Sequence, residues 1–126
     1  PAPGAAQPPP IAAWLGATRP KTLTAALAPI LIGAALAVAE GHRGRLWVPA
    51  VALLSALFIQ IGTNLINDAQ DFRRGADDAK RVGPQRATAS GLLSGRTVEL
   101  AGFLCFGLAI LCALPLAVLG GIPLIV

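Results

Sequence analysis

The chain has 126 residues, of which 55% are hydrophobic and 13% are charged, and its formal net charge is +4. Its mean hydropathy of +0.69 leaves less polar surface than a soluble domain of this length needs, so the composition excludes a water-facing monomer. We expect the protein to reside in the lipid bilayer and not to bind nucleic acid.

The first 13 residues are rich in Pro and Ala and carry no charge. A segment of this composition cannot bury a core, so residues 1–13 are predicted to be a disordered or extended tail. The tail lacks the basic n-region of a signal peptide. Residues 14–126 are then predicted to be part of a larger membrane domain, because the sequence shows no initiating Met, which indicates a fragment.

Three apolar stretches follow in chain order, at 23–39, 46–66 and 98–119. Each is close to the roughly 17 to 25 residues that cross a bilayer as a helix. Their apolar residues are continuous rather than alternating, which favours helices over strands. The final "GGIPLIV" resembles a turn followed by the start of a fourth apolar segment. We therefore predict an all-α integral membrane protein with three transmembrane helices and the beginning of another.

The basic residues predict the orientation of these spans. All of the ten Lys and Arg residues except Arg43 and Arg45 lie on the N-terminal side of the predicted membrane. By the positive-inside rule, the N-terminus and the segment 67–97 are cytoplasmic in a multi-pass protein of the cell (inner or plasma) membrane. Arg19 and Lys21 are interpreted as topology markers at the headgroups, and contact with a diphosphate is the alternative.

The predicted cytoplasmic loop 67–97 contains all four aspartates of the chain. At 100° per residue, Asn64, Asn67, Asp68 and Asp71 share one face of a helix, at spacings of three and four. Carboxylates so close together repel one another, and a divalent cation relieves that repulsion. Mg²⁺ prefers one or two carboxylates together with substrate phosphates. The pattern therefore favours a Mg²⁺ site for a phosphorylated substrate.

Basic residues after the aspartates fit the same chemistry. Lys80, Arg81 and Arg86 are candidates for binding diphosphate oxygens that a metal leaves uncovered, because Arg binds two oxygens at once. Arg73 and Arg74 are assigned to lipid headgroups. The alternative is a transporter or scaffold whose loop binds cations, or merely stays solvated, without catalysing a reaction.

Three stretches carry a resemblance to a known family. Asn67, Asp68, Asp71, Gly75 and Asp77, followed by Arg81, Gly83 and Pro84, match an Asp-rich motif of the form N-D-x-x-D-x-x-x-G-x-D with R-x-G-P after it. The other two stretches are "RPKTL" (19–23), before the first predicted helix, and "ATASGLLS" (87–94), before the third. The chain resembles the UbiA superfamily of membrane prenyltransferases, and most closely its menaquinone branch. Gly75 stands where the general motif has its last Asp, which argues against the 4-hydroxybenzoate and haem O branches.

The resemblance implies a helical bundle around a cavity open to lipid, with two Asp-rich loops. This chain contains the first of these loops, so residues 14–126 would be the N-terminal part of a UbiA-type prenyltransferase domain. It implies transfer of a polyprenyl group from polyprenyl diphosphate to 1,4-dihydroxy-2-naphthoate, with loss of the carboxylate, giving demethylmenaquinone. The roles implied are catalytic for Asp71 and Asp77, metal-binding for Asn67, Asp68, Asp71 and Asp77, and substrate-binding for Asn67, Lys80, Arg81 and Arg86. Another aromatic acceptor is the alternative within the superfamily.

Four further residues are interpreted from the sequence. Asn64 is predicted either to orient Asp68 or to pair with a neighbouring helix, and Gln60 either to face a cavity or to bond across helices. His42 is predicted to be a surface residue. Cys105 and Cys112 lie seven residues apart, about 10 Å along a helix, so no disulfide is expected between them.

Overall fold

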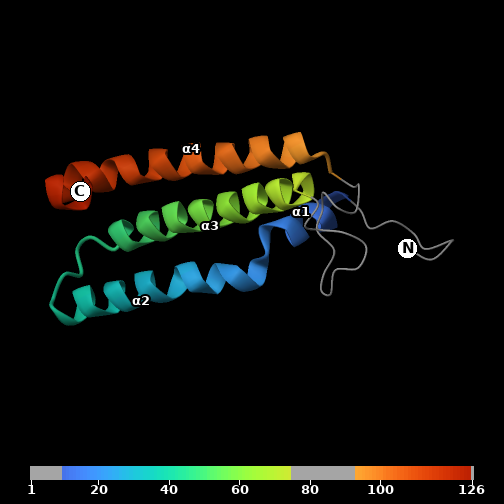
Figure 1. Cartoon of the computed structure of the whole chain (residues 1–126). Coiled ribbons are helices and arrows are strands. Elements are labelled where there is room, and N and C mark those ends of the chain that lie inside the picture. Colours follow the sequence, from blue (N-terminus) through green and yellow to red (C-terminus); the bar gives the residue numbers. More distant parts are fainter. Residues whose placement is uncertain (1–9, 75–92, 126) are drawn as a thin grey trace.

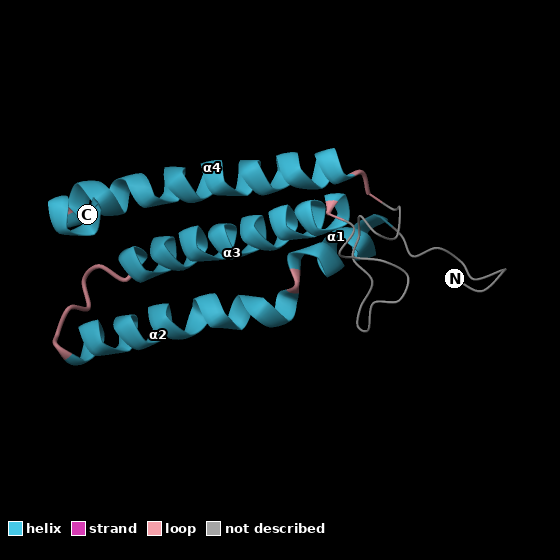
Figure 2. Ribbon diagram, in the orientation of Figure 1, coloured by secondary structure: helices cyan, strands magenta, loops and turns pink. Residues whose placement is uncertain are grey.

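The structure is a computed structural model that describes residues 10–74 and 93–125. Within these ranges it is all α, without strands (Figures 1 and 2). The elements in chain order are α1 (Pro10–Thr18), the short 3₁₀ helix η1 (Pro20–Thr22), α2 (Leu23–Ala39), α3 (Trp47–Arg73), α4 (Gly95–Gly120) and α5 (Ile122–Ile125).

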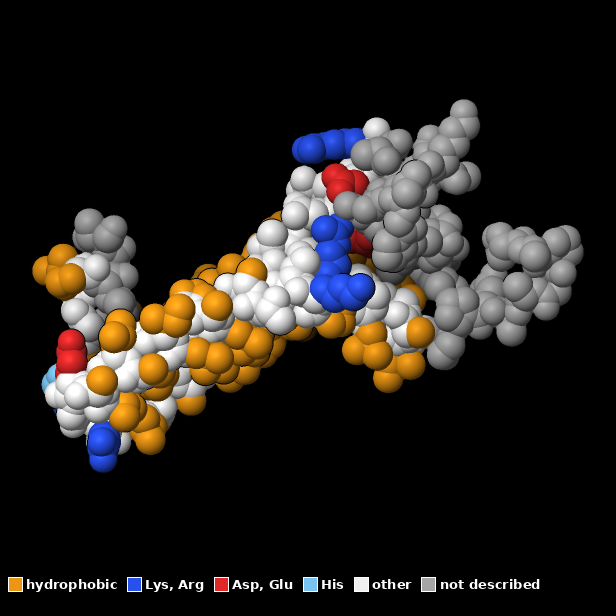
Figure 3. Space-filling view, turned by 90° about the horizontal axis from the view of Figure 1, so that it is seen from below, with side chains coloured by type: hydrophobic (Ala, Val, Ile, Leu, Met, Phe, Trp, Pro, Cys, Tyr) orange, Lys and Arg blue, Asp and Glu red, His pale blue; other side chains and the backbone are white. Residues whose placement is uncertain are grey.

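The three long helices run side by side and alternate in direction, with α3 between α2 and α4 (Figure 1). Three segments of the described chain are long and apolar enough to cross a membrane: 10–39, 47–73 and 95–120. Their apolar side chains cover the middle of the molecule, while charged side chains gather at its two ends (Figure 3). The predicted three-helix membrane protein is confirmed, and α5 follows α4 where a fourth apolar segment was expected.

Helix α3 is longer than the predicted span, so the segment 67–97 is not all loop. Its 27 residues extend about 40 Å, whereas the hydrocarbon core of a bilayer is about 30 Å thick. The last turns, Asn67 to Arg73, therefore project beyond the apolar region as helix, because a helix satisfies its own backbone hydrogen bonds in either environment. At the other end of this segment, α4 begins at Gly95, with the hydroxyl of Ser94 accepting a bond from the Thr97 amide at 3.1 Å.

The N-terminal tail is also shorter than predicted, because residues 10–13 are part of α1. Pro10 stands at the start of this helix, where a missing N–H costs nothing. Ala13 and Ala17 are then buried, 8% and 3% exposed, in a cluster with Leu65 and Ala69 of α3. Packing against α3 thus gives α1 the core that the tail composition did not suggest. Residues 1–9 lie outside the described part.

Close packing of α3 against α4 depends on Gly62 of α3 and Gly102 of α4. A Cβ added at Gly62 would lie 2.9 Å from the carbonyl oxygen of Gly102 and 2.8 Å from the ring of Phe106. The buried hydroxyl of Ser55 also donates to the carbonyl of Ala109 at 3.0 Å. Small residues let helix backbones approach in a membrane, and polar side chains then bond across the contact. Both cysteines, Cys105 and Cys112, are free, as predicted.

An ion pair joins the projecting ends of these two helices. Arg73 donates to both carboxylate oxygens of Glu99, at 3.0 Å and 2.5 Å. Arg73 thus has a partner on α4 that its assignment to lipid headgroups did not include. The Arg73 side chain is 52% exposed, so the pair contributes no more than about 1 kcal/mol to stability. Its main effect is to hold the end of α3 against α4.

Candidate functional site

The polar residues predicted to share a helix face do so at the end of α3, but they differ strongly in burial. Asn64 is 4% exposed and Asp68 is 1% exposed. Asp71 is half-buried and Asn67 is exposed. The face therefore passes from a buried side, with Asn64 and Asp68, to an accessible side, with Asn67 and Asp71. The two accessible residues are four apart and lie one above the other on the helix.

Asn64 holds the N-terminal segment against α3. Its Nδ2 donates to the carbonyl oxygen of Thr18 at 2.8 Å and to the hydroxyl of Thr22 at 2.9 Å. Its Oδ1 accepts from the Nε2 of Gln60 at 3.4 Å. Of the two roles left open for Asn64, the bond to a neighbouring helix is the one observed. Gln60 bonds within its own helix, which neither interpretation of that residue anticipated.

The backbone reverses direction at Arg19, which lies between Thr18 and Thr22, the two residues that Asn64 binds. Arg19 adopts the left-handed conformation, with φ 49° and ψ 68°, which is unusual for a residue other than glycine. Pro20 disfavours the right-handed helix for the residue before it, so α1 ends at Thr18. The Arg19 carbonyl accepts from the hydroxyl of Thr22 at 2.9 Å. The hydroxyl of Thr22 thus links this turn to Asn64.

Arg19 and Lys21 differ in their surroundings, although both were interpreted as topology markers. Lys21 is exposed, as a residue at the headgroups would be. Arg19 is half-buried, and the Nη2 atom of its guanidinium is fully buried. The Arg-Pro pair in the sequence signals a break in the helix here. It does not by itself signal that part of the Arg19 side chain is buried.

The structure places three of the predicted site residues on this face, Asn67, Asp68 and Asp71. The others, Asp77, Lys80, Arg81 and Arg86, lie outside the described residues. Within residues 10–74 and 93–125, no three His, Cys, Asp or Glu side chains are grouped closely enough to hold a metal ion. The amide of the exposed Asn67 and the carboxylate of the half-buried Asp71 nevertheless fit the hard, sparse ligand set that Mg²⁺ uses when phosphates and water complete its shell. Asp68 is too buried to be equally accessible.

We expect Asn64→Ala to loosen the contact between the α1–η1 segment and α3. The substitution leaves the Thr18 carbonyl and the Thr22 hydroxyl without their shared donor, and a buried polar group left unsatisfied costs about 1–3 kcal/mol. Hydrogen exchange should accelerate in residues 18–24 and the unfolding temperature should fall.

The matched control is Thr63→Ala, on the same turn. Thr63 is exposed and its hydroxyl bonds only to the carbonyl of Ile59 in its own helix. This control should leave exchange in residues 18–24 unchanged. Equal exchange in the Asn64 and Thr63 variants would contradict the role given to Asn64.

The fold and site together define a helical multi-pass membrane protein that carries amide and carboxylate side chains on a helix end beyond its apolar region. The model of the UbiA prenyltransferase family matches residues 26–126. The chain belongs to this family.

Curated relatives are similar to most of the chain. It is 42% identical over 89 residues to 1,4-dihydroxy-2-naphthoate octaprenyltransferase of Escherichia coli, covering 71% of this chain and 29% of that protein. The protein of the same name from Mycobacterium tuberculosis is 40% identical over 108 residues, covering 86% and 36% respectively. UbiA prenyltransferase domain-containing protein 1 of Dictyostelium discoideum is 30% identical over 113 residues, covering 82% and 34%. The chain thus spans about a third of the length of these relatives. No solved structure matches it.

Proposed function

We propose that the protein transfers a polyprenyl group from polyprenyl diphosphate to 1,4-dihydroxy-2-naphthoate in a reaction that requires Mg²⁺. The observation that carries this proposal is the accessible pair Asn67 and Asp71 on the projecting end of α3, in a chain of the UbiA prenyltransferase family. The names of the relatives from E. coli and M. tuberculosis support the choice of acceptor. The distribution of Lys and Arg supports a cytoplasmic location for this end of α3.

Binding of the donor follows from the charges around this face. Asn67, Asp71 and Asp77 would hold Mg²⁺, with Asp68 as a more buried contributor. The bound ion would neutralise charge on the diphosphate and so favour its departure. Lys80, Arg81 and Arg86 would bind the remaining diphosphate oxygens, with each Arg able to contact two of them. The prenyl chain would lie in the apolar region into which α3 continues.

The transfer step then exchanges one bond at each reactant. The bond between the first carbon of the prenyl chain and the diphosphate oxygen breaks, and both electrons leave with diphosphate. The ring carbon that bears the carboxylate bonds to the prenyl carbon, and the carboxylate leaves as CO₂, which yields the quinol form of demethylmenaquinone. Excluding water protects the allylic cation from capture as an alcohol.

The test is a transfer assay in membranes that contain the whole protein. Radiolabelled polyprenyl diphosphate is offered with either 1,4-dihydroxy-2-naphthoate or 4-hydroxybenzoate, and a parallel reaction uses naphthoate labelled in its carboxyl group. We expect a labelled prenyl product from the naphthoate alone, with equimolar release of the carboxyl label. Transfer to 4-hydroxybenzoate alone would overturn the choice of acceptor. Transfer to neither acceptor would favour a cation-binding transporter or scaffold.

A further inference from the structure

The turn between α2 and α3 carries positive charge at the end of the bundle remote from Asp71. Its basic residues are Arg43 and Arg45, both exposed, with His42 beside them. The ion pair between Arg73 and Glu99 lies at the opposite end of the bundle. The exposed carboxylate of Glu40, at the end of α2, offsets one of these two charges, so the turn presents a net positive charge to an outside partner.

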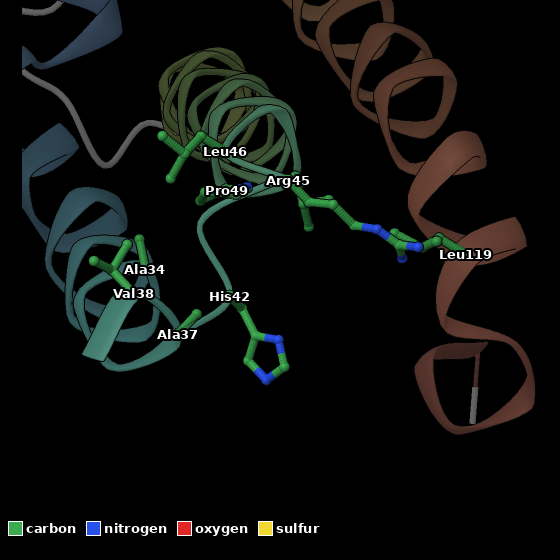
Figure 4. Close-up of a pocket in the computed structure, with 9 residues that line it drawn as sticks. Ala34, Ala37, Val38, His42, Arg45, Leu46, Pro49 and Leu119 are labelled. Atoms are coloured by element: carbon green, nitrogen blue, oxygen red, sulfur yellow. The ribbon is translucent and has the colours of Figure 1, made fainter. Parts of the chain in front are cut away.

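An apolar cavity of about 230 Å³ lies directly inside this turn, between α2, α3 and α4. Its walls include Ala34 and Val38 of α2, Leu46 just before α3, and Leu119 of α4. Figure 4 shows the side chain of Arg45 extending toward Leu119, with the ring of His42 on the turn beside it. The cavity thus combines apolar walls with a cationic rim.

The position of this cavity points to a lipid rather than to a soluble anion. Helix α2 ends at Ala39 and α3 begins at Trp47, so the turn lies at a boundary of the membrane. The Trp47 side chain is 46% exposed, as is common for an anchor at the interface. An acyl chain lying in this partly open cavity would gain dispersion contacts with its apolar walls, which an inorganic ion would not.

We propose that this cavity is a binding site for an anionic phospholipid. Arg45, which lines the cavity, binds the headgroup phosphate, since a guanidinium contacts two phosphate oxygens at once. Arg43 lines a neighbouring hollow together with Arg45 and adds a second positive charge for the same headgroup. The first part of an acyl chain lies against Ala34, Val38 and Leu119. Basic pockets between transmembrane helices bind anionic headgroups by this combination of charge and apolar contact. The site is separate from the prenyl-transfer site and does not depend on the function proposed for it.

The first test counts lipids retained by the whole protein in native mass spectrometry, with phosphatidylglycerol or phosphatidylcholine added to the detergent. Phosphatidylglycerol should be retained more tightly, and the double variant Arg43→Gln/Arg45→Gln should lose about fivefold in affinity per arginine. The control Arg74→Gln/Arg96→Gln removes the same charge from the other end and should keep the first tightly bound lipid. Equal retention of both lipids by the wild type, or full retention by the turn variant, would overturn the proposal.

The second test separates the acyl chain from the phosphate. Ala34→Leu fills the cavity and should weaken retention of phosphatidylglycerol, whereas Ala35→Leu, on the exposed side of the same helix, should not. Inorganic phosphate in large excess should fail to displace the lipid. Displacement by phosphate, or equal retention by both alanine variants, would identify a site for a soluble anion and would contradict the proposed lipid.

Discussion

Asp71→Asn is expected to lower the rate of prenyl transfer by about 10²- to 10³-fold. The side chain keeps its shape but loses the charge that draws Mg²⁺ to the diphosphate, and Asp71 is the accessible carboxylate among the described residues of this face. Because the residue is only half-buried, the unfolding temperature should change by no more than a few degrees. The measurement is the initial rate of transfer to 1,4-dihydroxy-2-naphthoate in membranes with matched protein levels.

Asp78→Asn is the matched control for this variant. It removes the same charge from the same Asp-rich segment, but position 78 is not part of the motif that the chain shares with the menaquinone branch. The control should retain most of the activity. Equal losses in both variants would mean that the segment acts through its total negative charge rather than through a specific ligand, and wild-type activity in Asp71→Asn would remove Asp71 from the site.

Gly62→Val should produce the largest loss of stability. The added Cβ would lie within 2.9 Å of a backbone oxygen on α4 and 2.8 Å from the ring of Phe106, so the two helices would have to separate. Overpacking of this kind costs about 1–3 kcal/mol, and separation also strains the bond from Ser55 to Ala109. Thermal unfolding of the protein in detergent measures the effect as a lower transition temperature.

Gly107→Val is the control, since a Cβ at Gly107 meets nothing within 4 Å. Both substitutions introduce the same side chain in a membrane helix, so differences in helix propensity cancel. We expect the Gly107 variant to unfold close to the wild-type temperature. If Gly62→Val were as stable as this control, the close contact of α3 with α4 would not be a determinant of the fold.

The helices were predictable from the sequence because their signal is local. Continuous apolar runs specified three spans, and the structure gives α2 the predicted bounds of 23–39. The shared face of Asn67, Asp68 and Asp71 also followed from spacing alone, since helix geometry fixes which residues lie together. The same local rule left the end of α3 undefined, because a polar sequence at the membrane surface is compatible with either helix or loop.

The features that were not predictable depend on residues distant in the sequence. The helix at residues 10–13 exists because Ala13 and Ala17 pack on α3, and no property of the tail itself indicates that partner. Asn64 bonds to residues 46 and 42 positions earlier, so spacing within α3 could not choose between its two roles. The pairing of Arg73 with Glu99 likewise required α4 to be placed beside α3. Helical periodicity predicted which polar residues share a face of α3. It could not predict that Asn64 and Asp68 on that face are buried while Asn67 is exposed.

Equilibrium binding of radiolabelled polyprenyl diphosphate to the purified whole protein, with and without Mg²⁺, tests the donor site at the end of α3 most directly. If Asn67 and Asp71 hold the diphosphate through the metal, binding to the wild type should require Mg²⁺, and Asp71→Asn should bind no more donor with Mg²⁺ than without it. Donor binding that is independent of Mg²⁺ and unchanged by Asp71→Asn would contradict the site and the mechanism derived from it.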